Sequence, residues 1–546
     1  MQLWLWWLQP EHRVTWIGTI LASLLLAWQT FLPAYYFYFV GKMKRPNPVI
    51  AIPTEWRVAM VVTKAPSEPW LIVQKTLRAC LKQSHLHDTW LADEDPQPET
   101  IAWCQQQGVQ LSCRKGIAAY HRGTWPRRTQ CKEGNLAYFY DHYGYDRYDI
   151  VVQLDADHVP EPGYVESMLR PFVDPKVGYV AAPSVCDANP QVSWVVNARA
   201  FVEAPMHGTL QAGHSDGWAP LCIGSHYAVR TVALQAIGGL GPELAEDHST
   251  TMMMNAHGWR GVFAFDAEAH GDGPACFTDF LTQEFQWAYS LTTLLLSVTP
   301  HYLGGLKPHL KFQFLFAQLW YPVYSFSMLL GVLLPFAAFV WNIDWVKVSF
   351  AEYVVRSQLP LLICLLCVRW LATRGWLRPQ NAKIISWETV LFQLARWPWV
   401  VVGVSYAVLS RMLHKELLFK VTPKGENRTK PLPVWTLLPY LTISIVSSVT
   451  VITLTQMGHR SGYSFLMLLN ALFYTGVSFA IVWAHIHENA PTTVLYLKSK
   501  AAVACSVICI VSAMGIKTLQ VVKSDFAEKM TLPTFSTSAE NDSNLK

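Results

Sequence analysis

Long apolar segments near both ends of this 546-residue chain limit its possible folds more than any other feature. About 20 consecutive apolar residues let a helix cross the hydrocarbon core of a bilayer. We predict six such spans, at residues 14–40, 312–341, 353–371, 434–457, 463–484 and 501–521. Between residues 46 and 311, short strand-like runs alternate with helix-like ones instead, so the sequence predicts an α/β domain inserted into a helical membrane protein.

The composition agrees with a membrane protein. The chain is 51% hydrophobic, only 15% charged, and contains 24 tryptophans. Soluble domains carry about 25% charged residues, so this chain is unusually apolar. The net charge of +5 is small, and no run of basic residues resembles a nucleic-acid-binding tract. We therefore expect the lipid bilayer as a partner and no nucleic acid.

Basic residues beside the predicted spans indicate the orientation of the chain. Lys42, Lys44 and Arg45 directly follow the first span, which places the α/β domain in the cytoplasm, at a plasma or inner membrane. The basic residues beside the later spans agree with this orientation only if residues 386–414 do not cross the bilayer. That segment has charged residues and a proline within its apolar run, which favours a helix lying in the membrane interface. We treat residues 14–40 as an anchor, because the apolar core is too long for a cleaved signal peptide.

Residues 150–154 predict a buried strand that ends in two carboxylates. The run is apolar and β-branched, and Asp155-Ala156-Asp157 follows it before Pro160 ends the segment. Open α/β sheets bind ligands at the carboxyl ends of their strands. Two carboxylates there could hold Mg²⁺ or Mn²⁺ against a diphosphate. For D-x-D alone, a solvated turn is the more common outcome.

Other runs predict more strands of the same sheet. Residues 56–63, 89–92 and 109–113 have strand character, and the second of these runs ends in Asp93. A carboxylate at that edge could accept hydrogen bonds from a base or a ribose, although an Asp-Pro turn is the alternative. A basic cluster that could face phosphates follows the third run, at Arg122, Arg127, Arg128 and Lys132. The usual alternative for such a cluster is a solvated loop.

Two polar pairs follow further along the chain. Glu246 and Asp247 stand near the start of a predicted helix, where the helix dipole favours carboxylates, so a capping role is the alternative to catalysis. If Asp247 faces a bound sugar donor, it could act as a general base. Gln283 and Trp287 are four residues apart and share a helix face, which suits a sugar ring. A tryptophan anchored at the membrane interface is the alternative.

Taken together, these elements resemble the family 2 processive glycosyltransferases, cellulose synthase in particular. Lys132-Glu133-Gly134-Asn135-Leu136 is similar to the K-A-G-N-L element of that family, and residues 419–425 are similar to its F-x-V-T-x-K-G gating loop. The resemblance covers roughly residues 50–430. It implies a GT-A-like fold with a mixed central sheet, and it agrees with the six predicted spans and the interface helices, because cellulose synthase also has an interface helix directly before its gating loop.

The resemblance also implies a role for each matching residue. Asp93, Asp155 and Lys132 would bind the nucleotide, and Asp157 with Asp155 would hold the metal. Asp247, next to Glu246, would be the catalytic base. Gln283 and Trp287 would hold the acceptor end of the glycan. The residues that would close over the nucleotide are Phe419, Val421 and Thr422.

These roles imply transfer with inversion from a nucleotide sugar, most plausibly linked to UDP, and secretion of a β-linked polysaccharide through the chain's own channel. We expect four regions: an anchor at 1–45, the transferase domain with a terminal interface helix at 46–300, a membrane segment with the gating loop at 301–430, and further spans with a polar tail at 431–546. Accessory secretion subunits are possible partners.

The chain departs from the family pattern at defined places. Gln286 stands where the Q-x-x-R-W element has arginine, which removes an expected cation near the diphosphate. Ala245 replaces the threonine of T-E-D but the acids remain. Only a short polar tail follows the last predicted span, so we do not expect regulation by cyclic-di-GMP through this chain. Two alternatives stay open: a single-transfer enzyme with a lipid or lipid-phosphate acceptor, and a transporter or assembly partner with a degenerate transferase domain.

Overall fold

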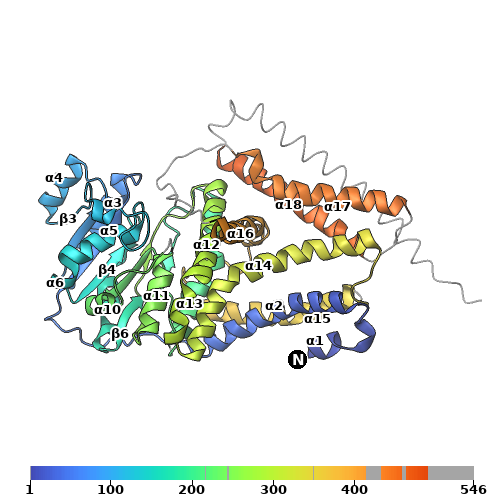
Figure 1. Cartoon of the computed structure of the whole chain (residues 1–546), viewed down its shortest axis with the longest axis horizontal. Helices are drawn as coiled ribbons and strands as arrows, with labels where there is room; N and C mark the ends of the chain where they lie inside the picture. The colour runs from blue at the N-terminus through green and yellow to red at the C-terminus, as the bar shows by residue number, and fades with distance from the viewer. Residues whose placement is uncertain are drawn as a thin grey trace, which may run out of the picture.

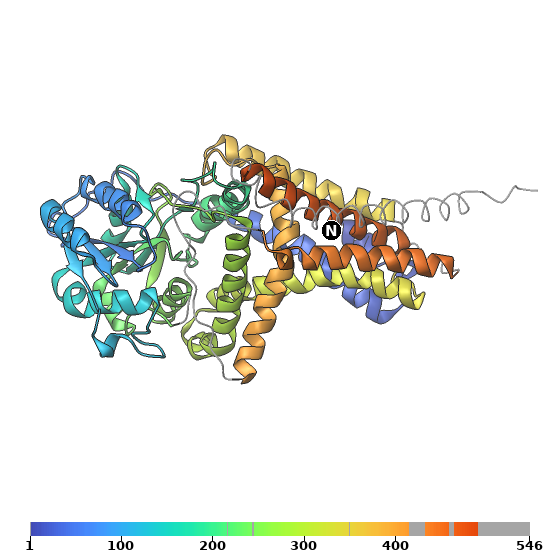
Figure 2. The same cartoon turned by 90° about the horizontal axis from the view of Figure 1, so that it is seen from above.

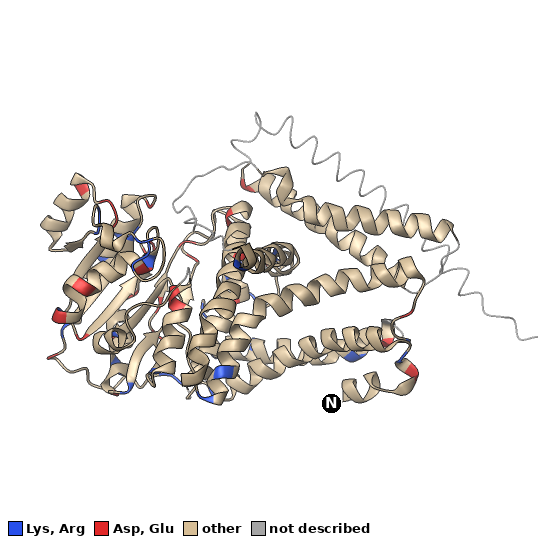
Figure 3. Cartoon of the chain, in the orientation of Figure 1, with Lys and Arg blue, Asp and Glu red and all other residues tan. Residues whose placement is uncertain are grey.

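A mixed β-sheet with flanking helices forms one end of the molecule, and long helices form the other (Figure 1). The computed structural model describes residues 2–215, 217–242, 245–348, 350–413, 432–457 and 463–489. Within these ranges, charged residues gather in the α/β part, and the long helices carry few of them (Figure 3). The prediction of an α/β domain inserted into a helical protein is therefore confirmed.

The main sheet has seven strands in the order β3-β2-β1-β4-β8-β6-β9. Strands β1 to β4 run parallel, and β8 is antiparallel to both of its neighbours, which makes the sheet mixed. The strands are β1 (Val58–Lys64), β2 (Asp88–Asp93), β3 (Gln110–Ser112), β4 (Ile150–Leu154), β6 (Val177–Ala181), β8 (His226–Arg230) and β9 (Arg260–Phe263). The four strands predicted from the apolar runs are all present.

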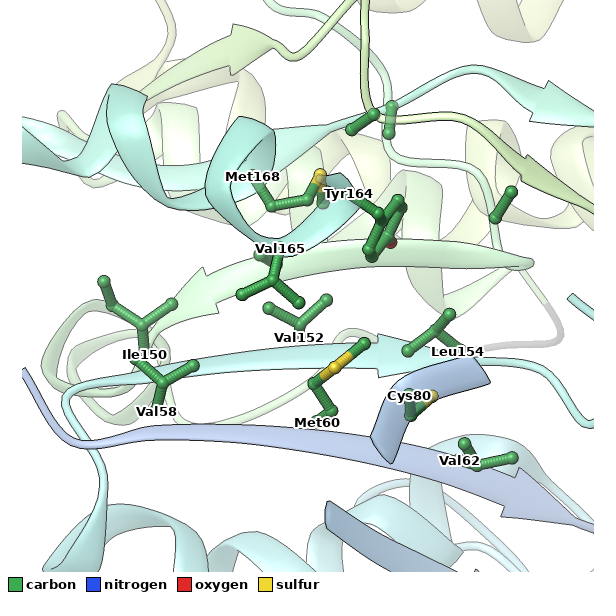
Figure 4. Close-up of a cluster of buried hydrophobic side chains, with 14 of the residues drawn as sticks. Val58, Met60, Val62, Cys80, Ile150, Val152, Leu154, Tyr164, Val165 and Met168 are labelled. Atoms are coloured by element: carbon green, nitrogen blue, oxygen red, sulfur yellow. The ribbon is translucent and has the colours of Figure 1, made fainter. Parts of the chain in front are cut away.

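Alternation along the central strands builds a separate core on each face of the sheet. Successive side chains of a strand point to opposite faces. Val58, Met60 and Val62 of β1 therefore pack on one face with residues of β4 and with Tyr164 (Figure 4), whereas Ala59 and Val61 pack on the other. All seven residues of β1 are buried because the strand lies between β2 and β4.

Short helices and a second, small sheet complete the domain. The small sheet has the order β5-β10-β7, formed by β5 (Val159–Pro160), β7 (Ser184–Val185) and β10 (Ala269–His270). The α-helices here are α3 (Trp70–Leu81), α4 (Pro98–Gln107), α5 (Lys132–Phe139), α6 (Tyr145–Arg147), α7 (Tyr164–Leu169), α8 (Trp194–Pro205), α9 (Gln211–His214), α10 (Thr231–Ala236) and α11 (Glu246–Ala256).

Five helices are long and apolar enough to cross a membrane within the described ranges. They are α2 (Trp16–Val40), α14 (Pro308–Trp341), α15 (Phe350–Thr373), α17 (Leu438–Gln456) and α18 (Tyr463–Glu488). Each coincides with one predicted span. The sixth predicted span, at residues 501–521, lies outside the described residues. A short helix, α1 (Gln2–Trp7), precedes α2.

Two further helices run across the direction of these five. In Figure 1, α16 (Trp387–Leu413) is seen end-on and α12 (Phe277–Ser297) stands upright, whereas α2 and α14 extend sideways. Figure 2 shows α16 along its length, again crossing the bundle direction. Neither α12 nor α16 is among the five candidate spans. That residues 386–414 lie in the membrane interface stays a prediction.

Candidate active site

The acids predicted at the strand ends lie at one edge of the sheet. Strand β1 pairs in parallel with β2 on one side and with β4 on the other. The carboxyl ends of β2 and β4 therefore face the same way, and Asp93 at the end of β2 lies on the same edge as Asp155, which directly follows β4. Ligands of open α/β sheets bind at this kind of edge.

Asp155, Asp157 and His158 offer ligand atoms that all lie within 4.8 Å of one another. Asp157 is almost fully buried, and one of its oxygens contacts Nδ1 of His158 at 3.2 Å. Its other oxygen accepts a hydrogen bond from the backbone N–H of Asp272 at 3.1 Å. Carboxylate oxygens and an imidazole nitrogen are donors that suit Mn²⁺, and the two carboxylates alone suit Mg²⁺. The residues present therefore fit a divalent metal.

Lys132, the first residue of helix α5, bonds to the group formed by Asp155, Asp157 and His158, which we call the metal-candidate group. Its ammonium donates a hydrogen bond to Oδ1 of Asp155 at 2.7 Å and another to the carbonyl oxygen of Gly224. Arg127, from the same predicted basic cluster, instead pairs with Asp141 at 2.7 Å. Lys132 is thus the member of the cluster that we find bonded to the D-x-D element within the described chain.

The neighbouring strand end is held in place by buried polar contacts. Asp93 is fully buried; its Oδ1 accepts a hydrogen bond from Lys64 at 3.1 Å, and its Oδ2 has no partner within the described residues. Asn135 donates to the carbonyl oxygen of Ala92 at 2.9 Å. Gly134 lies against the backbone of Arg128, where any side chain would collide. A buried carboxylate oxygen without a partner leaves capacity to accept a hydrogen bond from a ligand.

Glu246 and Asp247 begin helix α11, as the sequence predicts. Gly224 lies against both acids, since a Cβ built there would be 3.4 Å from Oδ2 of Asp247 and 4.0 Å from Oε1 of Glu246. The same Gly224 accepts a hydrogen bond from Lys132. The structure therefore brings Lys132, Asp155 and the two acids of α11 together, although they are far apart in the sequence.

Burial changes the acid strength of the α11 pair. Burial raises the pKa of Glu246, and the neighbouring Asp247 raises it further, while Lys132 lowers it. Burial also raises the pKa of Asp247, which accepts a compensating hydrogen bond from the backbone N–H of His248 at 2.7 Å. A general base works best when its pKa is near the working pH. The raised pKa of Asp247 moves this group in that direction.

Gln283 and Trp287 lie on α12, and a short loop joins this helix to the metal-candidate group. Both side chains are half-buried, whereas Glu284, Gln286 and Ala288 are buried. The loop runs from Asp272, whose N–H contacts Asp157, to the start of α12 at Phe277. The candidate acceptor helix therefore begins five residues after a contact to the candidate metal site. Phe419, Val421 and Thr422 lie outside the described residues.

Sequence reasoning missed three residues that shape this edge. Lys64 pairs with Asp93, His158 contacts Asp157, and Arg114 is fully buried with Glu94 as its partner. Arg114 also donates to the carbonyl oxygens of Tyr120 and Arg128. His158 could have been found, because it directly follows the D-x-D element. Lys64 and Arg114 gave no such signal, since each meets its partner only after folding.

Comparison with known families agrees with this geometry. Residues 150–345 match the family described as Glycosyl transferase family group 2. This part of the chain is therefore similar to family 2 glycosyltransferase domains. The matched range begins at β4 and includes D-x-D, α11 and α12.

Curated relatives of this glycosyltransferase domain are cellulose synthases. The chain is 24% identical over 310 residues to the UDP-forming cellulose synthase 1 catalytic subunit of Komagataeibacter xylinus, a match that covers 55% of this chain and 39% of that protein. It is 28% identical over 291 residues to the probable UDP-forming cellulose synthase A catalytic subunit 9 of Arabidopsis thaliana, covering 48% and 25%. The chain thus spans well under half the length of these relatives, and the domain is cellulose synthase-like.

Among solved structures, the chain is similar to a mannosyltransferase from Pyrobaculum calidifontis in complex with GDP-Man and Mn²⁺. The identity is 15% and the TM-score is 0.48. The match covers 72% of this chain and 99% of that one.

Proposed function

We propose that the chain is a membrane-embedded, processive glycosyltransferase that transfers sugar from a UDP-linked donor to the end of a β-linked polysaccharide, with inversion at the anomeric carbon. The observation that carries this proposal is the meeting of Asp155, Lys132, Glu246 and Asp247 at one sheet edge. The names of the curated relatives, which are UDP-forming cellulose synthases, support the donor and the polymeric product.

Donor binding would use the carboxyl edge of the strands. Asp93 would accept hydrogen bonds from the base or ribose through its unpartnered oxygen. Lys132, now bonded to Asp155, would approach the diphosphate, because an ammonium group is a good partner for phosphate oxygens. Phe419, Val421 and Thr422 of the gating-loop motif would close over the nucleotide.

Asp155 and Asp157 would hold the divalent metal, with His158 beside them. A bound Mg²⁺ or Mn²⁺ supplies positive charge that stabilises the departing diphosphate. Asp157 is held for this role by the backbone N–H of Asp272 and by His158. Those contacts fix its carboxylate before any ligand arrives.

Asp247 would take the proton from the acceptor hydroxyl as that oxygen attacks the anomeric carbon of the donor. Its raised pKa suits proton abstraction near neutral pH. Glu246 beside it shares the buried, acidic surroundings and would assist by holding a proton or a hydroxyl group. The leaving group is the nucleoside diphosphate, so the new glycosidic bond replaces the bond between sugar and phosphate.

Gln283 and Trp287 would hold the end of the growing glycan. An indole face packs against the C–H surface of a sugar ring, and an amide hydrogen-bonds its hydroxyls. The α12 helix that presents this pair packs on α16 and on the candidate span α14. We propose that the product leaves through a channel formed by these helices, from a cytoplasmic catalytic domain at the plasma or inner membrane.

The decisive experiment incubates the purified full-length chain, in lipid nanodiscs, with a panel of labelled nucleotide sugars that includes UDP-glucose, UDP-N-acetylglucosamine and GDP-mannose. Mg²⁺ or Mn²⁺ is added, EDTA serves as the matched control, and products are sized. We expect a long polymer from one UDP-linked donor and none with EDTA. A product one sugar longer than its acceptor would overturn processivity, and no incorporation from any donor would overturn the enzymatic proposal.

A further inference from the structure

The helix α12 exposes only part of its surface around Gln283 and Trp287. These two residues are half-buried, while Glu284 and Gln286 between them are buried. On a helix, residues at i and i+4 lie on one face. Gln283 and Trp287 thus form a small polar-aromatic face, and the surroundings of this face determine what it can bind.

Arg199 of α8 lies directly on this face. Its Nη1 donates a hydrogen bond to Oε1 of Gln283 at 3.2 Å, and its guanidinium carbon lies 4.5 Å from the centre of the Trp287 ring. One side chain therefore contacts both members of the pair. Arg199 is 84 positions from Gln283 in the sequence, so no local motif predicts this contact.

The charge of Arg199 is already neutralised within α8. Its Nε donates to both oxygens of Glu203, at 3.3 and 3.1 Å, and the arginine side chain is only 10% exposed. Burial raises the pKa of Glu203, but Arg199 and His207 lower it to about 2, so the carboxylate is ionised. Arg199 is therefore not a spare cation that replaces the arginine missing at Gln286. Its role has to come from its position.

Hydrogen bonds between side chains and backbone groups hold the N-terminal end of α8. Asn189, before α8, accepts a hydrogen bond from the N–H of Gly273 at 2.7 Å and donates to its carbonyl oxygen at 3.1 Å. At the start of α8, the N–H of Trp194 donates to Glu488 of α18 at 2.5 Å. The bonds of Asn189 thus join the segments that precede α8 and α12, which helps to keep the guanidinium beside Gln283 and Trp287.

We propose that Arg199 is a positioning residue for the glycan acceptor. It covers one side of the Trp287 indole and holds the Gln283 carboxamide by its oxygen, so that the remaining exposed surface of both residues meets the terminal sugar in one orientation. This inference rests on the proposed function, because it requires that Gln283 and Trp287 contact the glycan. A planar guanidinium can stack and donate in a fork at the same time, which lysine cannot do.

The test measures equilibrium binding of cellohexaose and chitohexaose to the full-length chain in nanodiscs, in the presence of UDP and Mn²⁺. We expect Arg199→Gln to weaken the binding of the preferred oligosaccharide about tenfold and to leave UDP affinity unchanged. Arg199→Lys should recover part of the loss, since it retains a cation over the indole. It also provides a second variant if Arg199→Gln fails to fold.

Glu203→Gln is the matched control, because it removes the same buried ion pair but keeps the contacts of Arg199 with Gln283 and Trp287. We expect it to change oligosaccharide affinity less than twofold, roughly the size of a lost weak contact. If Glu203→Gln weakens binding as much as Arg199→Gln, Arg199 acts only through the stability of α8, and the inference is wrong.

A double-mutant cycle then tests whether Arg199 acts through the indole. The losses of oligosaccharide affinity caused by Arg199→Gln and Trp287→Phe should be strongly non-additive. The double variant should bind only slightly more weakly than the single variant with the lower affinity. Additive losses, or an unaltered chain that binds neither oligosaccharide, would overturn the inference. The nucleotide-sugar panel separates the two proposals: absence of turnover overturns the proposed function, whereas the binding cycle decides the role of Arg199 by itself.

Discussion

The acidic sheet edge and the junction of α8, α12 and α16 both contain buried charges, but they treat them differently. At the edge, Glu246 is buried and Asp247 is half-buried, and neither forms an ion pair with any residue that the structure describes, although Lys64 and Lys132 pair with Asp93 and Asp155 nearby. At the junction, Arg199 pairs with Glu203, and Arg396 of α16 pairs with Glu284 of α12 at 2.7 Å. Both acids of the junction thus have a cationic partner, whereas the two acids of α11 have none in the described part of the chain.

Under the proposed function, this difference separates the chemical step from the binding of the glycan. Acids without a cationic partner hold their protons more tightly, so the α11 pair is suited to proton transfer. Paired charges gain nothing from a ligand but fix the helices that carry them. The candidate acceptor helix α12 is therefore held by paired charges, while the candidate reacting acids Glu246 and Asp247 lie side by side without a cationic partner in the described chain.

The sharpest test of the acidic edge is Asp247→Asn. Removal of a general base typically lowers the rate by about 10²- to 10⁴-fold, and we expect a loss of transfer in this range. UDP binding should stay within about twofold, because Asp93 and Lys132 are untouched. Steady-state transfer and calorimetric UDP binding measure the two effects. Transfer at the unaltered rate would remove Asp247 from the mechanism.

The sharpest test of the balanced junction is Arg396→Leu. It leaves Glu284 buried without its partner, which typically costs about 3–5 kcal/mol, and we expect a large drop in the midpoint of thermal unfolding. The double variant Glu284→Leu with Arg396→Leu removes both charges and should recover most of the loss. If the single and double variants unfold at the same temperature, the pair does not hold α12 and α16 together.

The pH dependence of transfer distinguishes the regions next. Burial raises the pKa of Asp247, so the base becomes protonated at a higher pH than an ordinary aspartate, whose pKa is about 3.9. We expect transfer to fall as the pH drops through this raised value, while UDP binding falls less. A pH–rate profile between pH 4 and 9 measures the pH at which the transfer rate falls. A fall centred on the pKa of an ordinary aspartate would contradict the assignment of Asp247 as the base.

The smallest expected effect is a gain in stability from Glu246→Gln. The pKa of Glu246 is raised in the folded chain, so its contribution to stability is present below the unfolded pKa and is lost as the pH rises through the folded value. Glutamine removes that loss, which should stabilise the chain by about 1 kcal/mol at alkaline pH and by less at pH 5. Thermal unfolding at both pH values checks the sign, and an equal effect at both would contradict it.

Local sequence patterns sufficed for the elements that carry the acids. The strands β1, β2 and β4 follow from short apolar runs, and the start of α11 at Glu246 follows from its carboxylates. Five of the predicted spans coincide with helices because length and apolarity alone decide that a segment can cross a bilayer.

Pairings across the fold could not be predicted in the same way. The antiparallel direction of β8 depends on the route of the chain through α8 and α9, which an apolar run does not encode. Lys64 and Arg199 each meet a partner through tertiary contacts, with Arg199 drawn from what looks like an ordinary amphipathic helix. The D-x-D element was predictable because its candidate ligands lie close together in the chain. The junction could not be predicted, since its charged residues come from separate helices.

The short loop from Asp272 to α12 has a mechanical consequence. At one end of this loop, Asp272 contacts Asp157 and the next residue, Gly273, is bonded to Asn189, so that end is held in place. Under the proposed function, the spacing between the reacting centre and the helix that grips the glycan then stays constant from one addition to the next. The polymer itself must then advance by one sugar per cycle, while the distance between the reacting centre and the helix that binds the glycan does not change.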